Sequence, residues 1–411
     1  MAHSSFVIVG AGLAGAKAVE ALRELGFDGR LTLIGDEEHL PYERPPLSKG
    51  YLAGNDSRES FIVHDAGWYD DHDVTLVLGR TTTAVDPDAH EVTLVDGNTH
   101  RYDKLLLATG SRARQLPLPG AGSLGVQTLR NVEDSDRISQ ALDRGGRLAV
   151  VGGGWIGMEV AANARDRGAE VTVIEAADVP LGLVLGPELA QVFLDLHREH
   201  GVTFHLGAQV SELTSLESKV TGVRLGDGTL VEADAVLVGI GAQPNIELAE
   251  AAGLDVDNGV LVDAALQSSN PDILAAGDIA NHEHPVLGRR VRVEHWANAL
   301  NQPAAAAATM LGTPTAYTEL PYFFTDQYDL GMEYVGHAPP GSYARVVTRG
   351  NLRGREFIAF WLDGSDHVLA GMNVNVWDVV DDVKTLILSG RPVDTQRLAD
   401  PDLPLAASLR A

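Results

Sequence analysis

Two glycine-rich turns contain the residues whose types and spacing are best suited to chemistry. The first turn, Gly10–Gly15, has the sequence GAGLAG and therefore the G-x-G-x-x-G spacing. Glycines at this spacing allow a tight turn and a close approach of backbone N–H groups to a pyrophosphate, whose charge the following helix N-terminus stabilises. An acidic residue, Asp36 or its neighbour Glu37, follows about 20 positions later, where it can contact a ribose. This context favours a dinucleotide site over an ordinary tight turn.

The second turn, Gly152–Gly157, repeats this pattern with the sequence GGGWIG. Glu175 lies where the next strand ends, and a carboxylate there can accept hydrogen bonds from both ribose hydroxyls. The same carboxylate repels a 2′-phosphate, and no arginine follows closely, because the next residues are Ala176, Ala177 and Asp178. We therefore predict a preference for NADH over NADPH. The alternative is that Glu175 only ends a strand.

Both turns lie inside strand–helix–strand units, which the periodicity of the apolar residues predicts. The predicted elements of the two units are strands at 6–9, 31–34, 147–151 and 171–174 and helices at 13–25 and 156–167. Further apolar strands that end close to a glycine are predicted at 105–107, 235–240 and 273–276. Units of this kind predict an α/β fold with two Rossmann-like dinucleotide-binding domains.

The pattern changes after Pro321 to short aromatic and β-branched runs separated by glycine-containing turns. Such runs predict a small antiparallel sheet. The segments involved are 343–348, 356–362 and 365–376, with one late helix expected at 379–388. We therefore expect a small C-terminal α+β domain after the two Rossmann-like domains.

The composition excludes several classes of function. The chain has 411 residues and contains no cysteine, which excludes disulfides, thiolate zinc sites, cysteine-ligated iron–sulfur clusters and cysteine nucleophiles. A formal net charge of −26 disfavours nucleic acid and anionic membranes as partners. The first residues lack the basic region of a signal peptide, and no apolar run of about 18 residues predicts a membrane span. We expect a cytoplasmic protein.

The ordered set of motifs resembles the flavin-dependent NAD(P)H:ferredoxin reductase family over essentially the whole chain. This family includes putidaredoxin reductases and the ferredoxin reductases of bacterial ring-hydroxylating dioxygenases, and its glutathione-reductase-like fold does not need redox cysteines. Besides the two glycine turns, the resemblance is carried by the segments 41–49 (PYERPPLSK), 108–110 (ATG), 276–278 (AGD), 292–299 (RVEHWANA) and 325–327 (TDQ). The resemblance implies an FAD-binding domain at 1–112 and 245–320, an NAD(H)-binding domain at 113–244 and a C-terminal interface domain at 321–411.

The resemblance also implies which residues bind the cofactors, FAD and NADH. FAD is expected rather than FMN, because the first glycine turn and Asp36 need an adenosine diphosphate half to bind. The implied cofactor-binding residues are Gly10, Gly12, Ala14, Gly15, Asp36, Arg44, Lys49, Thr82, Ala108, Thr109, Gly110, Arg130, Gly152, Gly154, Ile156, Gly157, Glu159, Glu175, Gly241, Gly277, Asp278 and Trp296.

Lys49 and Glu159 are the candidate catalytic residues, because in the resembling family this lysine lies near the flavin and pairs with this glutamate. A lysine near N5 and O4 of the flavin favours electron density arriving on the ring. Without the family, Lys49 would equally be a solvated lysine at a helix start. No residue is predicted to transfer a proton.

Four further residues receive roles from the resemblance. Asp278 is the implied acceptor for a ribityl hydroxyl of FAD, although an aspartate there could also cap a helix. Trp296 is implied to cover one face of the isoalloxazine, with an ordinary core tryptophan as the alternative. Arg130 is implied to contact FAD, and the backbone of Thr82 to meet the adenine.

The absence of cysteine means that electrons can leave only from the flavin. The resemblance therefore implies an NADH:ferredoxin oxidoreductase, in which NADH donates a hydride to FAD and single electrons pass to a [2Fe–2S] ferredoxin. That ferredoxin would serve a cytochrome P450 or a dioxygenase. Two alternatives stay open. One is a rubredoxin reductase or an NADH oxidoreductase with a diffusible acceptor, and the other is an NADH-sensing flavoprotein similar to apoptosis-inducing factor.

Two pairs of histidines, His197/His200 and His282/His284, have spacings that could bracket a metal. No third ligand follows at a recognisable spacing. We therefore interpret these histidines as solvated surface residues and predict no metal.

Pro303 interrupts a segment that the resembling family continues as a helix into the alanine tract 304–308. A proline inside a helix removes one hydrogen bond and clashes with the preceding turn. We expect either a kink at Pro303 or a helix in whose first turn Pro303 lies.

Arginines are locally dense in two places of this acidic chain. Ferredoxins of this kind are usually acidic, so a basic patch would orient their encounter with the enzyme. The alternative is scattered, solvated arginines paired with nearby acids. Phe324 stands where several relatives carry tryptophan, which puts an electron route through an indole there in doubt. The arginines concerned are Arg289, Arg290, Arg292, Arg345, Arg349, Arg353 and Arg355.

Overall fold

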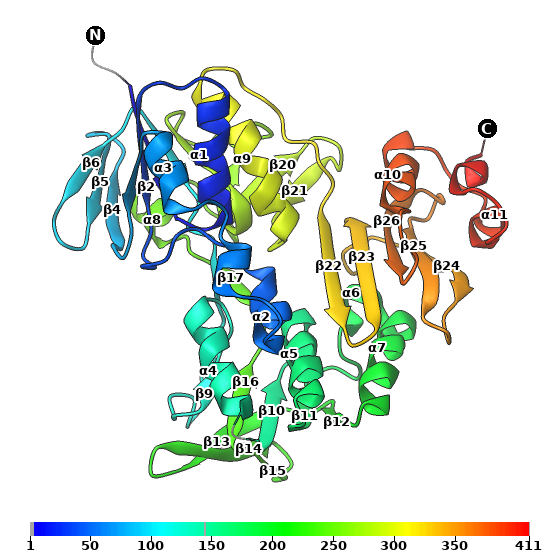
Figure 1. Ribbon diagram of the computed structural model, residues 1–411. Helices are drawn as coiled ribbons and strands as arrows, with labels where there is room; N and C mark the ends of the chain where they lie inside the picture. Colours follow the sequence, from blue (N-terminus) through cyan, green and yellow to red (C-terminus); the bar gives the residue numbers. More distant parts are fainter. Residues whose placement is uncertain (1–3, 144, 411) are drawn as a thin grey trace. The chain divides into compact units, whose positions relative to one another are not determined.

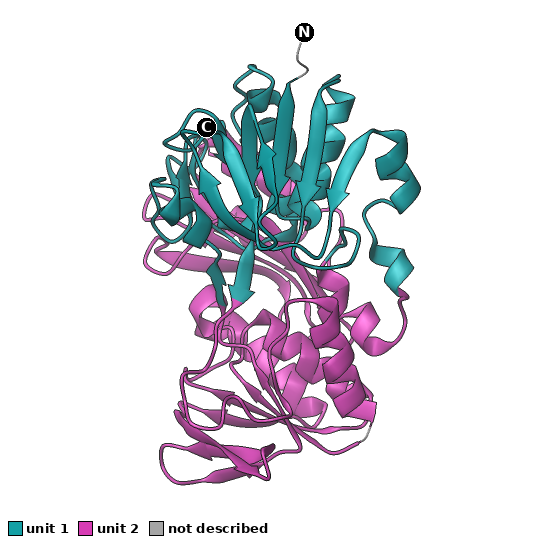
Figure 2. Cartoon of the chain, turned by 90° about the vertical axis from the view of Figure 1, so that its left-hand side faces the viewer, with its two compact units in different colours: residues 1–43, 58–112, 242–321 teal, residues 44–57, 113–241, 322–411 magenta. Residues whose placement is uncertain are grey.

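The computed structural model describes residues 4–143 and 145–410. The chain divides into two compact units, shown in teal and magenta in Figure 2. Unit 1 takes in residues 1–43, 58–112 and 242–321. Unit 2 takes in residues 44–57, 113–241 and 322–411. Each unit is described by itself below.

Unit 1 is built on a five-stranded parallel sheet in the order β19-β7-β1-β2-β3 (Figure 1). Its strands are almost wholly apolar and buried, which is typical of a parallel sheet covered on both faces. They are β1 (Ser5–Val9), β2 (Arg30–Ile34), β3 (Val74–Val77), β7 (Lys104–Leu107) and β19 (Ile273–Ala275). Helices α1 (Leu13–Glu24) and α9 (Trp296–Met310) pack against each other beside this sheet.

The register of unit 1 brings four chain segments to one edge. Val7 of β1 lies opposite Thr32 of β2 and Leu105 of β7, and Leu105 lies opposite Ile273 of β19. Because these strands are parallel, the turns that follow them emerge at the same edge of the sheet.

Smaller elements complete unit 1. An antiparallel sheet contains β4 (Thr82–Asp86), β5 (Glu91–Leu94) and β6 (Thr99–Arg101), and a mixed sheet contains β18 (Val260–Val262), β20 (Ala280–His284) and β21 (Arg289–Val291). The short helices are η2 (Arg58–Phe61), α3 (Ala66–Asp71), α8 (Glu247–Ala251) and η3 (Gly277–Ile279). Strands β8 (Ser111–Ala113) and β17 (Ala242–Pro244) lie where the chain passes between the units.

Unit 2 contains a second five-stranded parallel sheet, in the order β12-β11-β10-β16-β9. Its strands are β9 (Val126–Gln127), β10 (Arg147–Val151), β11 (Glu170–Glu175), β12 (Thr203–Leu206) and β16 (Ala235–Val238). The helices of this part are η1 (Pro45–Ser48), α2 (Gly50–Ala53), α4 (Val132–Asp143), α5 (Trp155–Asp166), α6 (Gly182–Leu185) and α7 (Pro187–Glu199). A three-stranded antiparallel sheet follows, with β13 (Val210–Leu216), β14 (Lys219–Leu225) and β15 (Leu230–Glu232).

The C-terminal part of unit 2 is a five-stranded antiparallel sheet in the order β22-β23-β26-β25-β24. Its strands are β22 (Tyr322–Gln327), β23 (Leu330–Gly336), β24 (Arg345–Asn351), β25 (Glu356–Leu362) and β26 (Val368–Val374). Helices α10 (Val380–Ser389) and α11 (Thr395–Ala399) and the 3₁₀ turn η4 (Leu405–Ser408) accompany it. Within unit 2, α5 packs against β22 and against η1.

These elements confirm the predicted fold class, two Rossmann-like sheets and a small C-terminal α+β part. For Pro303, one of the two alternatives is excluded: it is the eighth residue of α9 and does not lie in its first turn, so a kink at Pro303 stays a prediction. One other local prediction is wrong. His197, His282 and His284 are not solvated, because each is 0% exposed.

Candidate functional site

The first glycine turn joins β1 to α1 and is shaped by two close backbone approaches. Gly10 has a φ of +115°, and a Cβ there would lie 2.1 Å from the carbonyl oxygen of Ala108. A Cβ on Gly15 would lie 2.0 Å from the carbonyl oxygen of Gly10. Gly12 differs, because its φ is −88° and no atom of the described residues comes within 4 Å of a Cβ built there. The fold does not need glycine at Gly12, and the open space there suits the close approach of a phosphate to the backbone.

The other predicted FAD motifs meet this turn within unit 1. A Cβ on Gly277 would lie 3.2 Å from Ala14 Cβ, at the start of α1. Asp278 Oδ2 accepts a hydrogen bond of 2.8 Å from Ser111 Oγ. The Ala108–Gly110 loop is fixed by Asn245, whose Nδ2 donates to the Thr109 carbonyl at 2.8 Å. The structure therefore brings Gly10, Ala14, Ala108 and Gly277 together, as the sequence predicts.

The acidic residue after β2 is less clearly defined. Asp36 is exposed, and it has no hydrogen bond to any other residue that the structure describes. Its neighbour Glu37 is partly buried and accepts a hydrogen bond of 2.5 Å from Tyr42 Oη. Both carboxylates follow the strand whose end faces the first glycine turn, so either can meet a ribose, and Asp36 stays a prediction.

Several buried polar atoms of unit 1 fit a bound dinucleotide. Thr82 Oγ1, Asn298 Oδ1 and Gln302 Nε2 are buried and have no hydrogen-bond partner among the described residues. The other amide atom of Gln302, Oε1, accepts from the Gly277 N–H at 2.8 Å. Buried polar atoms are nearly always satisfied in folded proteins, so these atoms are expected to meet a ligand or water. Trp296, the first residue of α9, is held by a hydrogen bond of 3.0 Å from Nε1 to Glu43 Oε2.

The second glycine turn joins β10 to α5 in unit 2 and has the same construction. Gly152 has a φ of +103°, and a Cβ there would lie 2.3 Å from the Gly239 carbonyl oxygen. A Cβ on Gly157 would lie 2.2 Å from the Gly152 carbonyl oxygen, whereas a Cβ on Gly154 would have no described atom closer than 4.0 Å. Ile156 is 46% exposed at the start of α5. Gly154 thus repeats the situation of Gly12.

Glu175 ends β11 and is oriented by the backbone. Its Oε2 accepts a hydrogen bond of 2.6 Å from the Gly153 N–H, and its Oε1 accepts one of 2.8 Å from the Ala177 N–H. Each carboxylate oxygen has two lone pairs, so both can still accept from a ribose hydroxyl. Glu175 therefore does more than end a strand: it is fixed beside the glycine turn.

Lys49 and Glu159 form an ion pair within unit 2, between the loop after η1 and helix α5. Glu159 is 5% exposed. Its carboxylate also accepts hydrogen bonds from Ser48 Oγ at 2.5 Å and from Thr325 Oγ1 at 2.6 Å. The Phe324 ring lies 5.4 Å from Lys49 Nζ. The alternative of a solvated Lys49 is wrong, because only 14% of its side chain is exposed.

Asp326 adds a third carboxylate near this pair. Part of its surface is exposed, yet desolvation of its carboxylate raises the pKa of Asp326 above the ordinary range. Lys49 opposes this and lowers the pKa, while Glu159 and Glu333 raise it further. Two negative charges beside one lysine explain why a third carboxylate resists ionisation.

The remaining predicted residues of unit 2 lie in connecting loops. The Arg44 guanidinium donates to the Arg130 carbonyl oxygen. The Gly241 carbonyl oxygen accepts a hydrogen bond of 2.9 Å from the Arg114 N–H, and Gly241 has a φ of +98°. These contacts order the loops that carry Arg44, Arg130 and Gly241, and their contacts to a cofactor stay predictions.

Sequence reasoning missed Ser48 and Thr325 as partners of Glu159. They lie 111 and 166 residues from it in the chain, and neither belongs to a spacing pattern that includes Glu159. Both lie in segments that carry the family resemblance, so the importance of these segments could be predicted from the sequence, whereas the hydrogen bonds to Glu159 could not.

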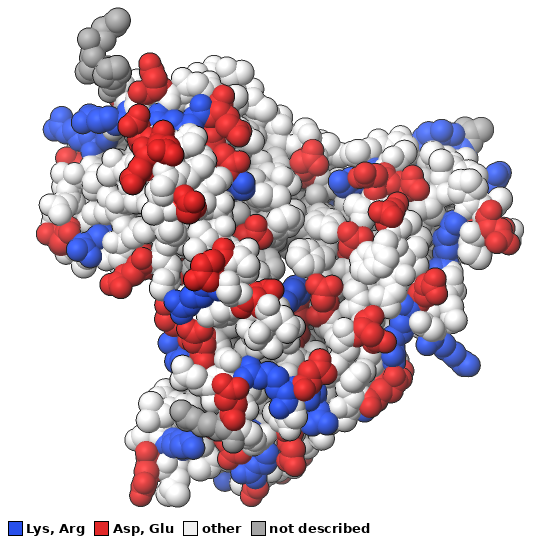
Figure 3. Space-filling model, in the orientation of Figure 1, with Lys and Arg blue, Asp and Glu red and all other residues white. Residues whose placement is uncertain are grey.

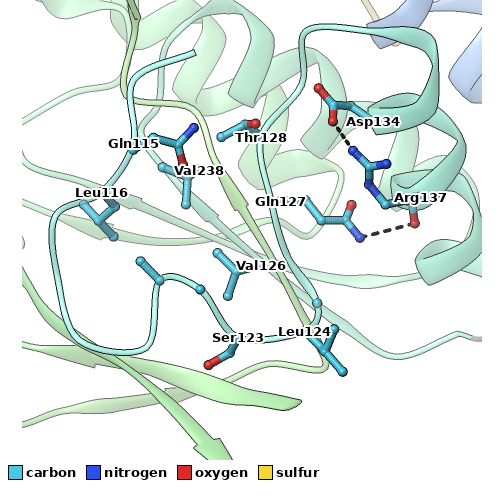
Figure 4. A pocket seen from close by; sticks show the side chains of 13 residues that line it. Gln115, Leu116, Ser123, Leu124, Val126, Gln127, Thr128, Asp134, Arg137 and Val238 are labelled. Carbon is cyan, nitrogen blue, oxygen red and sulfur yellow. Dashed lines mark hydrogen bonds and ion pairs between the residues drawn. The ribbon is translucent and has the colours of Figure 1, made fainter. Parts of the chain in front are cut away.

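A pocket of about 340 Å³ lies in unit 2, between the loop 115–128 and the start of α4 (Figure 4). Gln115, Thr128 and Val238 line it, and the Asp134–Arg137 ion pair closes one side. None of the predicted site residues lines this pocket. The backbone N–H groups of Arg130 and Asn131 also donate to Asp134, so the acid is satisfied by the protein itself.

The arginines that could form a basic patch are largely engaged within the protein. Arg292 pairs with Glu294 at 2.7 Å, Arg345 with Asp366 at 3.3 Å, and Arg355 with Glu199 at 2.6 Å. Lys and Arg side chains are interspersed with Asp and Glu side chains on the face drawn in Figure 3. The predicted basic docking patch therefore stays a prediction, with these local pairs favouring the alternative.

Within residues 4–143 and 145–410, no helix is long and apolar enough to cross a membrane. No group of three or more His, Cys, Asp or Glu side chains in the same ranges could hold a metal ion.

Comparison with known proteins gives matches over the whole chain. A model of the pyridine nucleotide-disulphide oxidoreductase family matches residues 4–303, and a model of the reductase C-terminal domain matches residues 322–409. The chain is 42% identical over 410 residues to the ferredoxin–NAD(+) reductase component of the anthranilate 1,2-dioxygenase system of Burkholderia cepacia, with 100% of both chains covered. It is 39% identical to putidaredoxin reductase of Pseudomonas putida, covering 100% of this chain and 98% of that protein.

A solved structure is equally similar. In the crystal structure of the covalent putidaredoxin reductase–putidaredoxin complex, the similar chain is 39% identical and superposes with a TM-score of 0.94. The match covers 99% of each chain.

Proposed function

This chain belongs to the pyridine nucleotide-disulphide oxidoreductase family, and we propose that it is an FAD-dependent NADH:ferredoxin reductase. It passes electrons from NADH to a [2Fe–2S] ferredoxin that serves a cytochrome P450 or a dioxygenase. One observation carries the proposal: relatives that align end to end are ferredoxin–NAD(+) reductases, and the chain has no cysteine with which to reduce a disulfide.

Unit 1 supports FAD as the resident cofactor. The first glycine turn, with open space above Gly12, suits a pyrophosphate at the N-terminus of α1. Asp278, held by Ser111, suits a ribityl hydroxyl, and Trp296, held by Glu43, suits a flat ring system. When bound, FAD supplies the hydride acceptor and one-electron donor that no side chain of this protein provides.

Unit 2 supports NADH as the electron donor. Glu175 is already oriented by two backbone N–H groups, so a ribose diol can bind without first ordering this side chain. Its negative charge disfavours the 2′-phosphate of NADPH. The open position at Gly154 leaves room for the pyrophosphate at the N-terminus of α5.

The Lys49–Glu159 pair supplies the charge of the site. Lys49 carries a positive charge that favours electron density arriving nearby, and Glu159 holds the ammonium in place. Because Glu159 is buried and accepts from three donors, the pair is held in one geometry.

The test is a purification followed by flavin analysis and rapid kinetics. Acid extraction is expected to release FAD, NADH is expected to reduce the flavin with a higher kcat/KM than NADPH, and cytochrome c reduction is expected to require added ferredoxin. Release of FMN, or equal turnover with diffusible acceptors and with a panel of ferredoxins, would overturn the proposal.

The same experiment separates the alternative functions. A flavoprotein similar to apoptosis-inducing factor would be reduced slowly, form a long-lived charge-transfer complex with NAD and change its oligomeric state. Transfer to rubredoxin but not to ferredoxin would identify a rubredoxin reductase. The cytoplasmic location stays a prediction from the sequence.

A further inference from the structure

A line of buried hydrogen bonds leads from Glu159 through strand β22 to helix α7. Thr325 Oγ1 lies 2.6 Å from Glu159 Oε1, and Gln327 Nε2 lies 3.2 Å from Thr325 Oγ1. His197 Nε2 lies 2.9 Å from Gln327 Oε1. Thr325, Gln327 and His197 are each 0% exposed. The whole line lies inside unit 2.

We infer that Thr325, held by Gln327 and His197, is a positioning residue that keeps the Glu159 carboxylate aimed at Lys49, and thereby sets the reduction potential of the flavin. The inference rests on the proposed function, in which Lys49 stands beside the flavin. It adds residues from the C-terminal sheet and from α7 to the electrostatics of that site.

The direction of each hydrogen bond follows from the charge of Glu159. An ionised carboxylate only accepts, so the Thr325 hydroxyl must donate to it. The Thr325 oxygen is then available to accept from the amide nitrogen of Gln327, which turns the amide oxygen of Gln327 toward His197. His197 must therefore donate from Nε2. Every donor in the line points toward Glu159, so each bond strengthens the next.

The far end of the line is neutral and closed. Burial lowers the pKa of His197 to about 4, with the bond to Gln327 opposing the shift and nearby His200 adding to it. His197 Nδ1 is buried and has no hydrogen-bond partner in the described part of the chain. The rings of Phe204 and Tyr328 pack edge-on against the imidazole at 6.3 Å and 5.1 Å. His197 is thus held as the Nε2–H tautomer, and it adds no second charge.

This line orients Glu159 and does not conduct protons. The side-chain amide of Gln327 can relay a proton only by changing to its unfavourable imidic acid tautomer. His197 has no route to water, because it is fully buried. The function left for the line is to fix the position of one carboxylate.

The segment that supplies Thr325 is itself firmly attached within unit 2. Tyr328, in the turn after β22, has a φ of +56° and stacks on His200 at 3.7 Å. Trp155, at the start of α5, packs against Phe323 of β22 at 5.3 Å. These contacts hold β22 against both α5 and α7, so the Thr325 hydroxyl has little freedom to leave Glu159.

The consequence for the flavin follows from charge balance. With three donors, the Glu159 carboxylate is held beside Lys49 and offsets its charge. With the Thr325 donor removed, the carboxylate can turn away from Lys49, and the longer distance weakens this offset. The site then becomes more positive and favours the reduced flavin, which carries the added negative charge.

The experiment measures the midpoint potential of the FAD-loaded protein in three variants. Thr325→Val keeps the shape of the side chain and removes the hydroxyl, Thr325→Ser keeps the hydroxyl, and Lys49→Gln removes the positive charge. Thr325→Val is expected to shift the equilibrium toward reduced flavin about tenfold, which is about +30 mV for a two-electron couple. Thr325→Ser is expected to keep the wild-type potential, and Lys49→Gln is expected to lower it.

The three variants separate the ways in which the inference can fail. If Lys49→Gln lowers the potential while Thr325→Val leaves it unchanged, the inference is wrong and the proposed function stands. If Lys49→Gln also leaves the potential unchanged, Lys49 is not beside the flavin, and the inference is wrong together with the role proposed for the Lys49–Glu159 pair, while flavin extraction and the ferredoxin assay test the proposed function separately. Gln327→Met gives an independent readout when Thr325→Val does not retain FAD, and a potential equal to wild type in that variant contradicts the inference. An equal shift in Thr325→Val and Thr325→Ser would point to packing rather than to the hydroxyl, and would also contradict it.

Discussion

The two glycine turns share one backbone design but differ in what surrounds the helix that follows. Lys17 stands seven residues after Gly10, and Glu159 stands seven residues after Gly152. Lys17 lies on the surface, 24% exposed, and pairs with Glu20 of its own helix. Glu159 is buried and pairs with Lys49, from a segment far away in the chain. The comparison teaches that the same backbone turn can be followed by a surface ion pair or by a buried one, depending on which segments of the chain pack against the helix.

The acidic residues that follow the two turns also differ in how firmly the protein holds them. Glu175 is held by two backbone N–H groups beside the second turn, whereas Asp36 is exposed after β2. A resident cofactor can order its own ribose contact once, because it does not leave. A substrate that binds and leaves in each turnover benefits from a carboxylate that is already in place.

The largest effect is expected at the glycines that the fold itself requires. Gly10→Ala and Gly152→Ala each place a Cβ within 2.3 Å of a carbonyl oxygen at a positive φ. Each variant is expected to lose about 4 kcal/mol or more of stability. Thermal unfolding monitored by circular dichroism measures the loss.

The matched controls are the glycines with open space. Gly12→Ala and Gly154→Ala should cost only about 1 kcal/mol of stability, the usual loss when a preferred N-cap residue is replaced by alanine, because the added Cβ meets no nearby atom of the described residues. Gly12→Ala is expected to lose FAD, and Gly154→Ala is expected to keep FAD and raise KM for NADH. A Gly12→Ala variant that is strongly destabilised but retains FAD would show that Gly12 serves the fold rather than the cofactor, and would contradict this prediction.

The next effect concerns Lys17 and Glu159, each of which stands seven residues after the first glycine of its turn. Glu159→Ala leaves the Lys49 ammonium without its buried partner and is expected to cost about 3–5 kcal/mol of stability. Lys17→Ala removes one surface ion pair and is expected to cost less than about 0.5 kcal/mol. Urea unfolding of both variants measures the difference, and similar losses would show that the pair in unit 2 behaves as a surface pair.

Acid is expected to destabilise both units by a similar mechanism. Burial lowers the pKa of His197 in unit 2 to about 4, and burial, with neighbouring His284 adding to it, lowers the pKa of His282 in unit 1 to about 4. Unfolded histidine titrates near pH 6.5, so between these values only the unfolded chain takes up the proton. The stability is fully present above about pH 6.5 and falls as pH falls toward 4, by up to about 3 kcal/mol for each histidine.

The measurement is the unfolding midpoint against pH for the wild type and for His282→Leu. The variant is expected to lose part of the slope between pH 6.5 and 4, while the part due to His197 remains. A slope that is unchanged in the variant would exclude His282 as a contributor.

The smallest effect is expected at Glu175. Glu175→Ala removes a charged hydrogen-bond acceptor for the ribose, which is worth about 1.5–3 kcal/mol, and removes the repulsion of a 2′-phosphate. The ratio of kcat/KM for NADH to that for NADPH is therefore expected to fall at least about tenfold. A ratio that does not change would show that the orientation of Glu175 by Gly153 and Ala177 serves the fold alone.

The sequence could predict the two βαβ units because their signals are local. Apolar runs such as Arg147–Val151 and the glycine spacing of the turns that begin at Gly10 and Gly152 are visible within a few neighbouring residues. The surroundings of Glu159 could not be predicted in this way. Thr325, Gln327 and His197 meet only after α5, α7 and β22 have packed, and a histidine that ends up 0% exposed reads as a surface residue beside charged neighbours.

Pro303 shows a second limit of local reasoning. A proline inside a helix is unfavourable on its own. Helix α9 nonetheless runs from Trp296 to Met310. Ala305, Ala306 and Ala307 on this helix are buried in the hydrophobic core of unit 1, and this packing stabilises the helix beyond the proline. Tertiary packing therefore decided the extent of this helix.

Strand β22 limits how the C-terminal segment can be exchanged between members of the family. The strand begins the C-terminal segment, yet Thr325 and Gln327 complete a hydrogen-bond line whose other members lie in α5 and α7. A chimera joined before Tyr322 would exchange those two side chains together with the rest of the segment. Recombination between relatives would therefore alter the electron-transfer driving force even when every nucleotide-binding residue is kept, and a graft that keeps threonine and glutamine at these positions is the one expected to retain it.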